Sequence, residues 1–142
     1  MKSLLRTSAV AVVLIAVCIL FAACIPTDEA KLQAKELLLC LSSGDYEGAS
    51  LYMHPSYVIS ADLMHSTVEE YLKSGADLSA GIDDVSFNSI QSSYYDRTVD
   101  GKHLVLGGVV TLSDGTKFDV SFEFIDNDSG YGISRFSASS FR

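Results

Sequence analysis

The chain has 142 residues and carries 18 acidic against 10 basic side chains, which gives a formal charge of −8. A protein with this balance is repelled by phosphate backbones, so nucleic-acid binding is excluded. The length allows one ordinary domain behind an N-terminal segment of different composition.

The N-terminal segment has the pattern of a secretory signal. Lys2 and Arg6 precede a run from Ala9 to Ala23 that contains no charged side chain. This run is at or below the short end of the roughly 20 apolar residues that span a bilayer. Small residues then stand directly before Cys24. We predict a signal peptide over residues 1–23; the alternative is an uncleaved signal anchor.

Residues 20–24, "LFAAC", resemble a bacterial lipobox, with Phe21 where Leu, Val or Ile is usual. Cys18 suits the motif less well, because bulky Val17 precedes it. The resemblance implies that Cys24 receives a diacylglyceryl group, whose two chains hold a protein firmly where one does not. It also implies lipid anchoring in a cell membrane or outer membrane, facing the extracytoplasmic side. Loss of Lys2 and Arg6 would take the charge from −8 to −10.

Three helices are predicted next. We expect residues 24–27 to form a very short tether and residues 28–142 a single domain. The first helix runs over 28–43, and its buried face has the spacing of one helix side: Ala30, Ala34, Leu37, Leu38 and Leu41. Gly44 ends it, and Asp45 caps a short second helix. The third helix spans 61–74 with the inner side chains Met64, Val68, Tyr71 and Leu72.

Cys40 lies within the first helix, in "ELLLCLSS". With Cys24 lipidated, it has no partner within the chain for a disulfide. We therefore expect it to be buried, as free cysteines often are.

From Asp84 onward the apolar period becomes two, as in β-strands. The stretch "KFDVSFEFI" places Phe118, Phe122 and their neighbours on one face. The hairpin before this stretch could have a two-residue loop over 114–115 or a three-residue loop over 113–115. The two loops pair the strands in different registers, and a shift of one residue exchanges the inner and outer faces of the sheet. Only the three-residue loop pairs Val110 with Phe118 and makes one sheet face entirely apolar. It requires Gly115 to adopt a left-handed backbone conformation. Further turns are predicted at Asp100–Gly101 and Asp126–Gly130. The fold class is therefore α+β, with N-terminal helices on a four-stranded antiparallel meander.

The segments "GDYEGAS" and "GYGI", in this order of elements, resemble the nuclear transport factor two-like, or cystatin-like, superfamily, which includes small bacterial lipoproteins. Tyr131 stands where relatives often have Trp. The resemblance implies a curved sheet wrapped round a long helix, forming a cone-like roll that is either filled or hollow. The superfamily includes isomerases and dehydratases as well as non-catalytic binding modules.

No catalytic or metal-binding constellation is visible in the sequence, and we expect no cofactor. His54 lies at a helix end, His65 on a solvated helix face and His103 at a strand start, without the short spacing of a metal site. Asp83 and Asp84 could ligate a cation, but an acidic pair directly before a strand is more often part of a loop. We expect the fold to tolerate replacement of all three histidines.

Three polar side chains are candidates for a pocket. Tyr94 and Tyr95 are adjacent on the first strand, so one of them must face inward. Simple alternation points Arg135 into the core, where it would anchor an anionic ligand. A buried lone guanidinium is costly, however, so a bulge that turns Arg135 outward and Phe136 inward is the favoured alternative.

The function hypothesis is a membrane-anchored, non-catalytic module that binds a protein or a small-molecule ligand. The alternatives are a small cone-pocket enzyme and a self-assembling envelope protein. We also expect a weak homodimer through the outer sheet face, where Val105, Val109 and Ile125 form an apolar strip, while Leu32 and Leu39 point away from the first helix's buried face.

Overall fold

The computed structural model describes residues 25–96 and 101–140; within the first strand, the side chains of residues 89 and 91–96 are not described. The helices are α2 (Thr27–Ser43), α3 (Tyr46–Ser50) and α4 (Ala61–Lys73), with short 3₁₀ helices η1 (Pro55–Tyr57) and η2 (Leu78–Ala80). The strands are β1 (Ile82–Asp96), β2 (Gly101–Leu112), β3 (Lys117–Asn127) and β4 (Gly130–Ser140). The predicted α+β fold class is confirmed.

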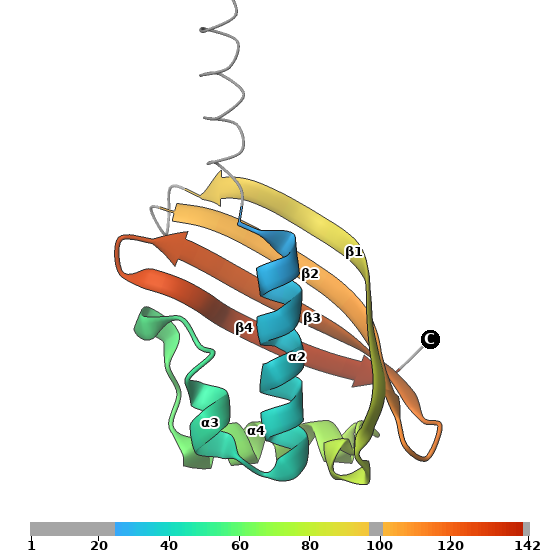
Figure 1. The fold of residues 1–142 in the computed structure, drawn as a ribbon. Helices are drawn as coiled ribbons and strands as arrows, with labels where there is room; N and C mark the ends of the chain where they lie inside the picture. The colour runs from blue at the N-terminus through green and yellow to red at the C-terminus, as the bar shows by residue number, and fades with distance from the viewer. Residues whose placement is uncertain (1–24, 97–100, 141–142) are drawn as a thin grey trace, which may run out of the picture.

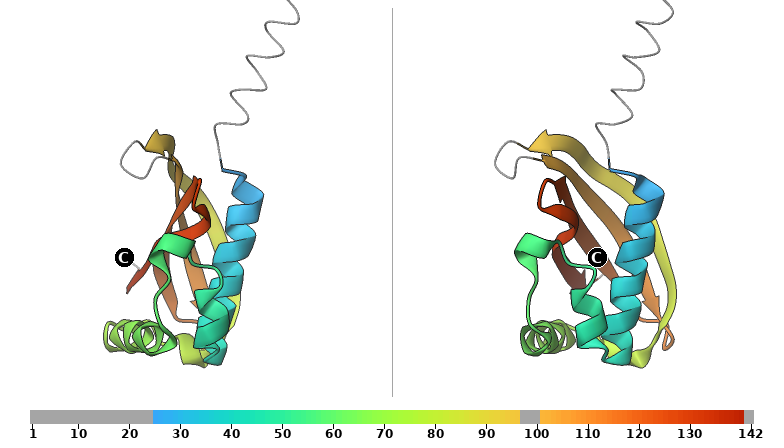
Figure 2. Two further views of the ribbon diagram at one scale, coloured as in Figure 1. Left: turned by 90° about the vertical axis from the view of Figure 1, so that its left-hand side faces the viewer. Right: turned by 60° about the vertical axis from the view of Figure 1, so that its left-hand side comes forward.

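The four strands form one antiparallel sheet in the order β1-β2-β3-β4. The sheet is strongly curved, and α2 runs across one of its faces (Figure 1). Helices α3 and α4 lie toward the C-terminal end of α2, and α4 is seen end-on in the turned views (Figure 2). The molecule is thus a curved sheet closed on one side by a helical layer.

Helix α2 has the buried face that its sequence predicts: Ala30, Ala34, Leu37, Leu38 and Leu41 are all buried. Gly44 ends the helix with φ at 76°, a conformation that costs a glycine least. The Asp45 carboxylate then accepts a hydrogen bond of 2.9 Å from the Gly48 amide and begins α3. Both signals follow from local chain chemistry, which is why the sequence predicts them.

Two helical side chains differ from the prediction. Leu72 is 50% exposed, because Tyr71, its neighbour on α4, takes the inward position and reaches the sheet. Cys40 is half-buried at the edge of the core rather than fully buried. Its partial burial raises the pKa of the thiol, and the nearby Asp45 and Glu36 carboxylates raise it further, so Cys40 remains a thiol at neutral pH.

The register of the β2–β3 hairpin is the one that makes a dry inner face. The Leu112 amide donates to the Thr116 carbonyl over 2.8 Å, and Val110 pairs with Phe118. Gly115 has φ at 84°, as a three-residue loop requires.

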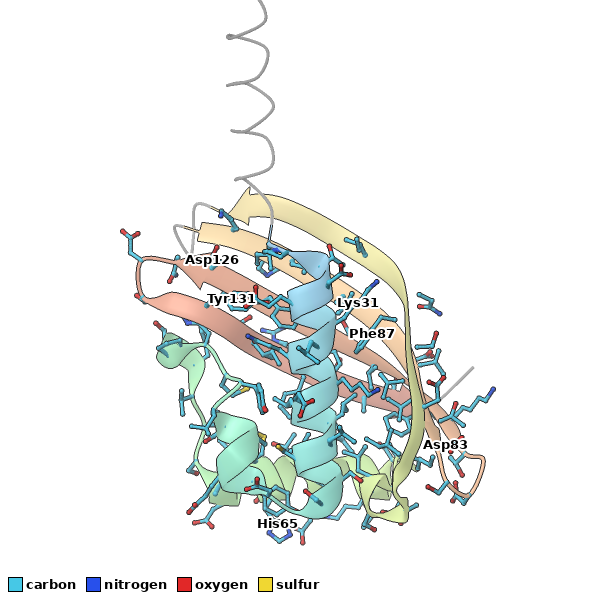
Figure 3. The ribbon with its side chains drawn as sticks, viewed as in Figure 1. Lys31, His65, Asp83, Phe87, Asp126 and Tyr131 are labelled. Carbon is cyan, nitrogen blue, oxygen red and sulfur yellow. The ribbon has the colours of Figure 1, made fainter. Side chains whose placement is uncertain are left out.

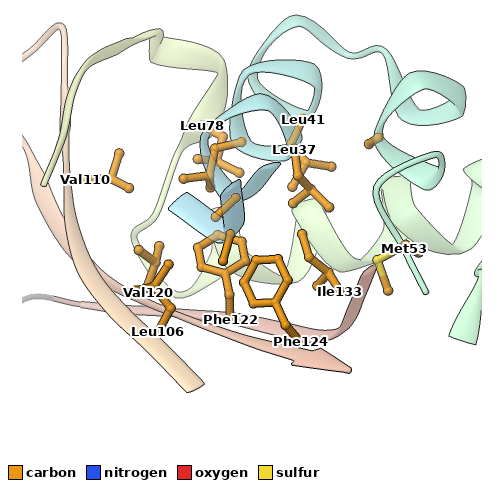
Figure 4. Packing of buried hydrophobic residues seen from close by; sticks show 14 of the residues in the cluster. Leu37, Leu41, Met53, Leu78, Leu106, Val110, Val120, Phe122, Phe124 and Ile133 are labelled. Atoms are coloured by element: carbon orange, nitrogen blue, oxygen red, sulfur yellow. The ribbon is translucent and has the colours of Figure 1, made fainter. Parts of the chain in front are cut away.

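The core lies between α2 and the inner face of the sheet (Figure 4). Phe118, Phe122 and Phe124 of β3 are completely buried. The Phe122 ring contacts two further aromatic rings, with centroid distances of 6.2 Å to Phe87 and 6.4 Å to Phe136. Burial of one such side chain contributes roughly 2–3 kcal/mol, so these three phenylalanines supply a large share of the core's stabilisation.

The edge of β4 is covered by other parts of the chain. The Ile133 amide donates to the Tyr52 carbonyl over 2.9 Å, and the Ile133 carbonyl accepts from the His54 amide over 2.8 Å. Further along the edge, the Tyr71 hydroxyl donates to the Phe136 carbonyl over 3.0 Å. These bonds satisfy edge groups that would otherwise be open to pairing with another strand.

At the N-terminal end of the described residues, the chain is already packed into the domain. Ile25 is only 3% exposed and belongs to the hydrophobic core. The first backbone bond of α2 follows at once, from the Ala30 amide to the Pro26 carbonyl. Within residues 25–96 and 101–140, no helix has the length and hydropathy needed to cross a membrane.

Candidate functional site

The structure does not bring the three predicted pocket residues together. Tyr94 and Tyr95 belong to β1 and Arg135 to β4, which are the two outer strands of the sheet. Three strand spacings, about 14 Å, separate those strands. Tyr94 pairs with His103 and Tyr95 with Lys102 in the backbone register, whereas both tyrosine side chains lie outside the described part. Cys24 also lies outside the described residues.

Arg135 faces away from the core, because β4 contains the expected bulge. The register of β3 and β4 shifts between Glu123 and Phe124, which leaves one extra residue on β4 after Ile133. The Arg135 side chain is 75% exposed, and its guanidinium lies 3.8 Å from the Glu123 carboxylate. Phe136 takes the inward position and packs against the core. Arg135 is therefore a surface cation.

A groove of about 360 Å³ runs between β4 and the segment from Met53 to Thr67. Its lining is largely apolar and comprises Met53, Tyr57, Val58, Ile59, Thr67, Ser134, Arg135 and Phe136. Tyr57 and Val58 are 41% and 56% exposed, so apolar surface continues beyond the groove. A volume of this size is at the lower end of ordinary small-molecule sites.

The polar groups of this groove are mostly occupied. The Thr67 hydroxyl donates to the Leu63 carbonyl over 2.9 Å, and the Ser134 hydroxyl donates to the Glu123 carbonyl over 3.2 Å. Arg135 is the cation of the lining, which contains neither a carboxylate nor an imidazole among the described residues. The groove can therefore bind an apolar group and offer a positive charge at its rim, but its lining supplies no paired acid and base.

The surroundings of His54 argue against the expectation that the fold tolerates its loss. It is completely buried. Its Nδ1 accepts a hydrogen bond of 3.1 Å from the Ser56 amide, so the ring proton of the neutral form is on Nε2. Nε2 lies 3.0 Å from the Asn127 side-chain oxygen and 3.1 Å from the Gly130 carbonyl. The imidazole thus joins the segment after α3 to the β3–β4 turn, in a contact we call the His54 clip.

The other two histidines have different surroundings. His65 is exposed, as predicted, and its ring stacks on Tyr46 at 4.9 Å and lies 3.7 Å from the Glu69 carboxylate. His103 is 9% exposed, with Nε2 3.9 Å from a carboxylate oxygen of Glu123. Within the described residues, no three His, Cys, Asp or Glu side chains are grouped as a metal site requires.

Two further hollows lie on the surface. One, of about 350 Å³, is enclosed by the C-terminal end of α2, α4 and the region of η2, and its lining includes His65, Glu69 and Asp77. The other, of about 330 Å³, lies on the outer sheet face at Gly107 and Gly108, which have no side chain to fill it. Figure 3 shows His65 at the end of the molecule opposite to Asp126 and Tyr131.

Two buried polar atoms were not identified from the sequence. Within the described part of the chain, neither the Tyr131 hydroxyl nor the side-chain oxygen of Gln33 has a hydrogen-bond partner. Tyr131 stacks on Phe124 at 6.0 Å, and its burial raises the pKa of the hydroxyl, with Glu29 and Asp126 raising it further. The hydroxyl therefore remains a donor. The inward direction of Tyr131 was readable from its alternation with Ile133, but the lack of a partner was not.

We expect the partly buried hydroxyl of Tyr71 to make the free energy of unfolding fall at alkaline pH. Burial, with a smaller effect of Glu70, raises its pKa to about 12. The ordinary pKa near 10 applies to the unfolded chain, so the stabilisation is complete below about pH 10 and is lost as the pH rises toward 12. Because Tyr71 is only partly buried, solvent screening reduces this effect, and we expect Tyr71→Phe to lessen the alkaline fall in unfolding free energy by an amount on the order of 1 kcal/mol. Urea unfolding between pH 8 and 12 measures this. The exposed Tyr57, changed to Phe, is the control; equal pH profiles for Tyr71→Phe and the parent would contradict the prediction.

We compared the chain with family models, curated proteins and solved structures, and only the last comparison gave a match. No family model matches the chain, and no curated protein matches it. Among solved structures, the chain is similar to a designed nuclear-transport-factor-two-like protein named Rd1NTF2_05, which carries five substitutions. The two chains are 14% identical, the match covers 80% of this chain and 98% of the other, and the TM-score is 0.45. The fold described above rests on the order of helices and strands and on the strand register.

Proposed function

We propose that this chain is a lipoprotein, anchored through Cys24 and facing the extracytoplasmic side of a cell membrane or outer membrane. The basic start, the apolar run and the "LFAAC" segment support a signal that is cut before Cys24. The burial of Ile25 is consistent with that cut, because the residue that would follow the lipidated cysteine is already part of the hydrophobic core. The diacylglyceryl thioether supplies the two acyl chains needed for firm anchoring.

Cys24→Ala should abolish lipid attachment and leave an unprocessed or released protein. The alanine has no thiol to alkylate, so no diacylglyceryl group is added, and the mature lipidated mass should disappear. Intact-mass spectrometry of the detergent phase measures both effects. Cys40→Ala is the matched control and should retain the lipidated mass. A Cys24→Ala protein that is still processed and still partitions into the detergent phase would refute the anchoring proposal.

For the folded domain, we propose a non-catalytic module that binds the apolar part of an anionic ligand or of a protein segment. The carrying observation is the groove beside β4, with Met53 and Phe136 in its lining and Arg135 as its cation. The alternative enzyme function has a narrower basis, the unpartnered Tyr131 hydroxyl and Gln33 oxygen among the described residues. These atoms provide a donor and an acceptor, without a paired acid and base.

Arg135→Gln should weaken binding of an anionic amphiphile several-fold and leave a neutral one unchanged. The guanidinium is mostly exposed, so its attraction for an anion is modest and screened by salt. A fluorescent fatty acid and its methyl ester, titrated against the domain expressed from Ile25 onward, measure the difference. Lys73→Gln, on the exposed end of α4, is the charge-matched control. Equal losses for acid and ester, or no binding of either, would overturn this proposal.

Self-association through the outer sheet face remains a proposal. Val105 and Val109 are half-buried there, but Ile125 is 3% exposed and therefore adds little to the apolar strip. Sedimentation of the domain expressed from Ile25 onward, at high concentration, tests it, because Val109→Glu should remove any dimer formed through this face.

A further inference from the structure

The two ends of the molecule are chemically and topologically distinct. At the upper end, as Figure 1 shows it, lie the N-terminus of α2 and the β3–β4 turn. Gly101, the first residue of β2, pairs with Asn127 at the same end. The β2–β3 hairpin and the C-terminal end of α2 lie at the lower end, where the Ser113 amide donates to the Gly81 carbonyl over 2.9 Å.

The first described residues, at the upper end, are packed against the rest of the fold. Ile25, the residue after Cys24, is buried in the core, and α2 begins at Thr27. Adjacent Cα atoms are about 3.8 Å apart, so a lipid on Cys24 would be bonded to the chain within one residue of packed structure. A flexible tether of ten residues would instead have a mean reach of about 17 Å and leave the domain free to turn.

We propose that the upper end of this domain is a membrane-contact surface that rests on the lipid headgroups, in a fixed orientation. The surface is formed by the first turn of α2 at Asp28, the start of β2 at Lys102 and the β3–β4 turn at Ser129. The inference rests on the proposed lipidation of Cys24. Buried Ile25 supplies the constraint, because the two acyl chains and the core are joined by a single peptide unit.

Electrostatic attraction is not what holds this surface to the bilayer. Its described charges include Asp28, Glu29 and Asp128, against Lys31 and Lys102. Lys102 is already paired with Asp126 over 3.3 Å. The surface is acidic, so anionic lipid would repel it at low ionic strength, and salt would weaken that repulsion. The contact is imposed by the covalent anchor and is best formed on a zwitterionic bilayer.

The orientation also decides which sites face outward. Helix α2 has 17 residues. At 1.5 Å per residue it is about 26 Å long, and α4 lies beside its C-terminal end (Figures 1 and 2). The lower hollow, with His65 and Asp77 in its lining, therefore stands about 26 Å from the headgroups and is open to extracytoplasmic partners.

Two labelling positions distinguish the ends of the molecule. Ser129→Cys places a spin label on the upper β3–β4 turn, and Lys117→Cys places one at the lower end, at the start of β3; both native side chains are exposed. Each variant is made in the lipidated full-length protein with Cys40→Ala and reconstituted into phosphatidylcholine vesicles. Lipids with a gadolinium chelate on the headgroup provide the paramagnetic probe. We expect at least a roughly fivefold greater relaxation enhancement at residue 129 than at residue 117.

A flexible insertion provides the control. Ten Gly and Ser residues between Cys24 and Ile25 should reduce the difference between the two labels to less than about twofold, while the lipidated mass is retained. Equal enhancement at 129 and 117 in the lipidated parent would overturn the fixed orientation and leave the lipoprotein proposal intact. Absence of the lipid on Cys24 by mass spectrometry would instead overturn the lipoprotein proposal, and this inference with it. Circular dichroism identifies any labelled variant that fails to fold.

Discussion

Replacement of His54 by alanine should destabilise the domain by about 3 kcal/mol. The imidazole is completely buried, and Nε2 lies within hydrogen-bond distance of the Asn127 side chain and the Gly130 carbonyl. Alanine would leave a cavity, and the Gly130 carbonyl and the Ser56 amide would lose the imidazole as a partner. Urea unfolding near pH 7, with the slope compared between variants, measures the loss.

His65 is the matched control, because it is a histidine on a solvated helix face. Its contacts to Tyr46 and Glu69 are exposed, so His65→Ala should change the unfolding free energy by less than about 0.5 kcal/mol. If His54→Ala cost less than about 1 kcal/mol, the His54 clip would not be an important support of the fold. The hypothesis that all three histidines are dispensable would then regain its basis.

The parts of the fold that the sequence predicted are set by short-range patterns. The α2 stripe repeats every three or four residues and ends at Gly44, so both its inner face and its end can be read locally. The register of Val110 with Phe118 follows from one requirement, that a single sheet face be dry. The outward turn of Arg135 follows from the cost of burying an unpaired charge.

The candidate site is formed by residues that are far apart in the sequence, and short-range patterns do not show which of them come together. His54 and Asn127 are 73 residues apart in the sequence, and nothing near either of them indicates the other. The groove is formed where η1 and α4 approach the edge of β4, so it follows from tertiary packing. Tyr94 and Arg135 are both polar residues on strands, but the strand order places them on β1 and β4, at opposite edges of the sheet.

Gly132 should be the glycine least tolerant of a side chain at the His54 clip. A Cβ there would lie 2.6 Å from the His54 amide nitrogen and 2.8 Å from its Cα. Both are backbone atoms, which cannot rotate away as a side-chain end could. The segment would have to move from β4 and weaken the bond between the His54 amide and the Ile133 carbonyl. We expect Gly132→Ala to cost about 3 kcal/mol.

Gly44→Ala separates this steric effect from glycine's conformational freedom. Gly44 has φ at 76°, and no atom lies within 4 Å of the position that a Cβ would take, so alanine there should cost only about 1 kcal/mol of left-handed strain. Urea unfolding of the two variants compares the costs, and equal losses would show that close approach at Gly132 is unimportant.

His54→Ala and Gly132→Ala act on the same contact, so the double variant should lose less unfolding free energy than the sum of the two single losses. Additive losses would mean that the imidazole and the backbone approach support the fold independently.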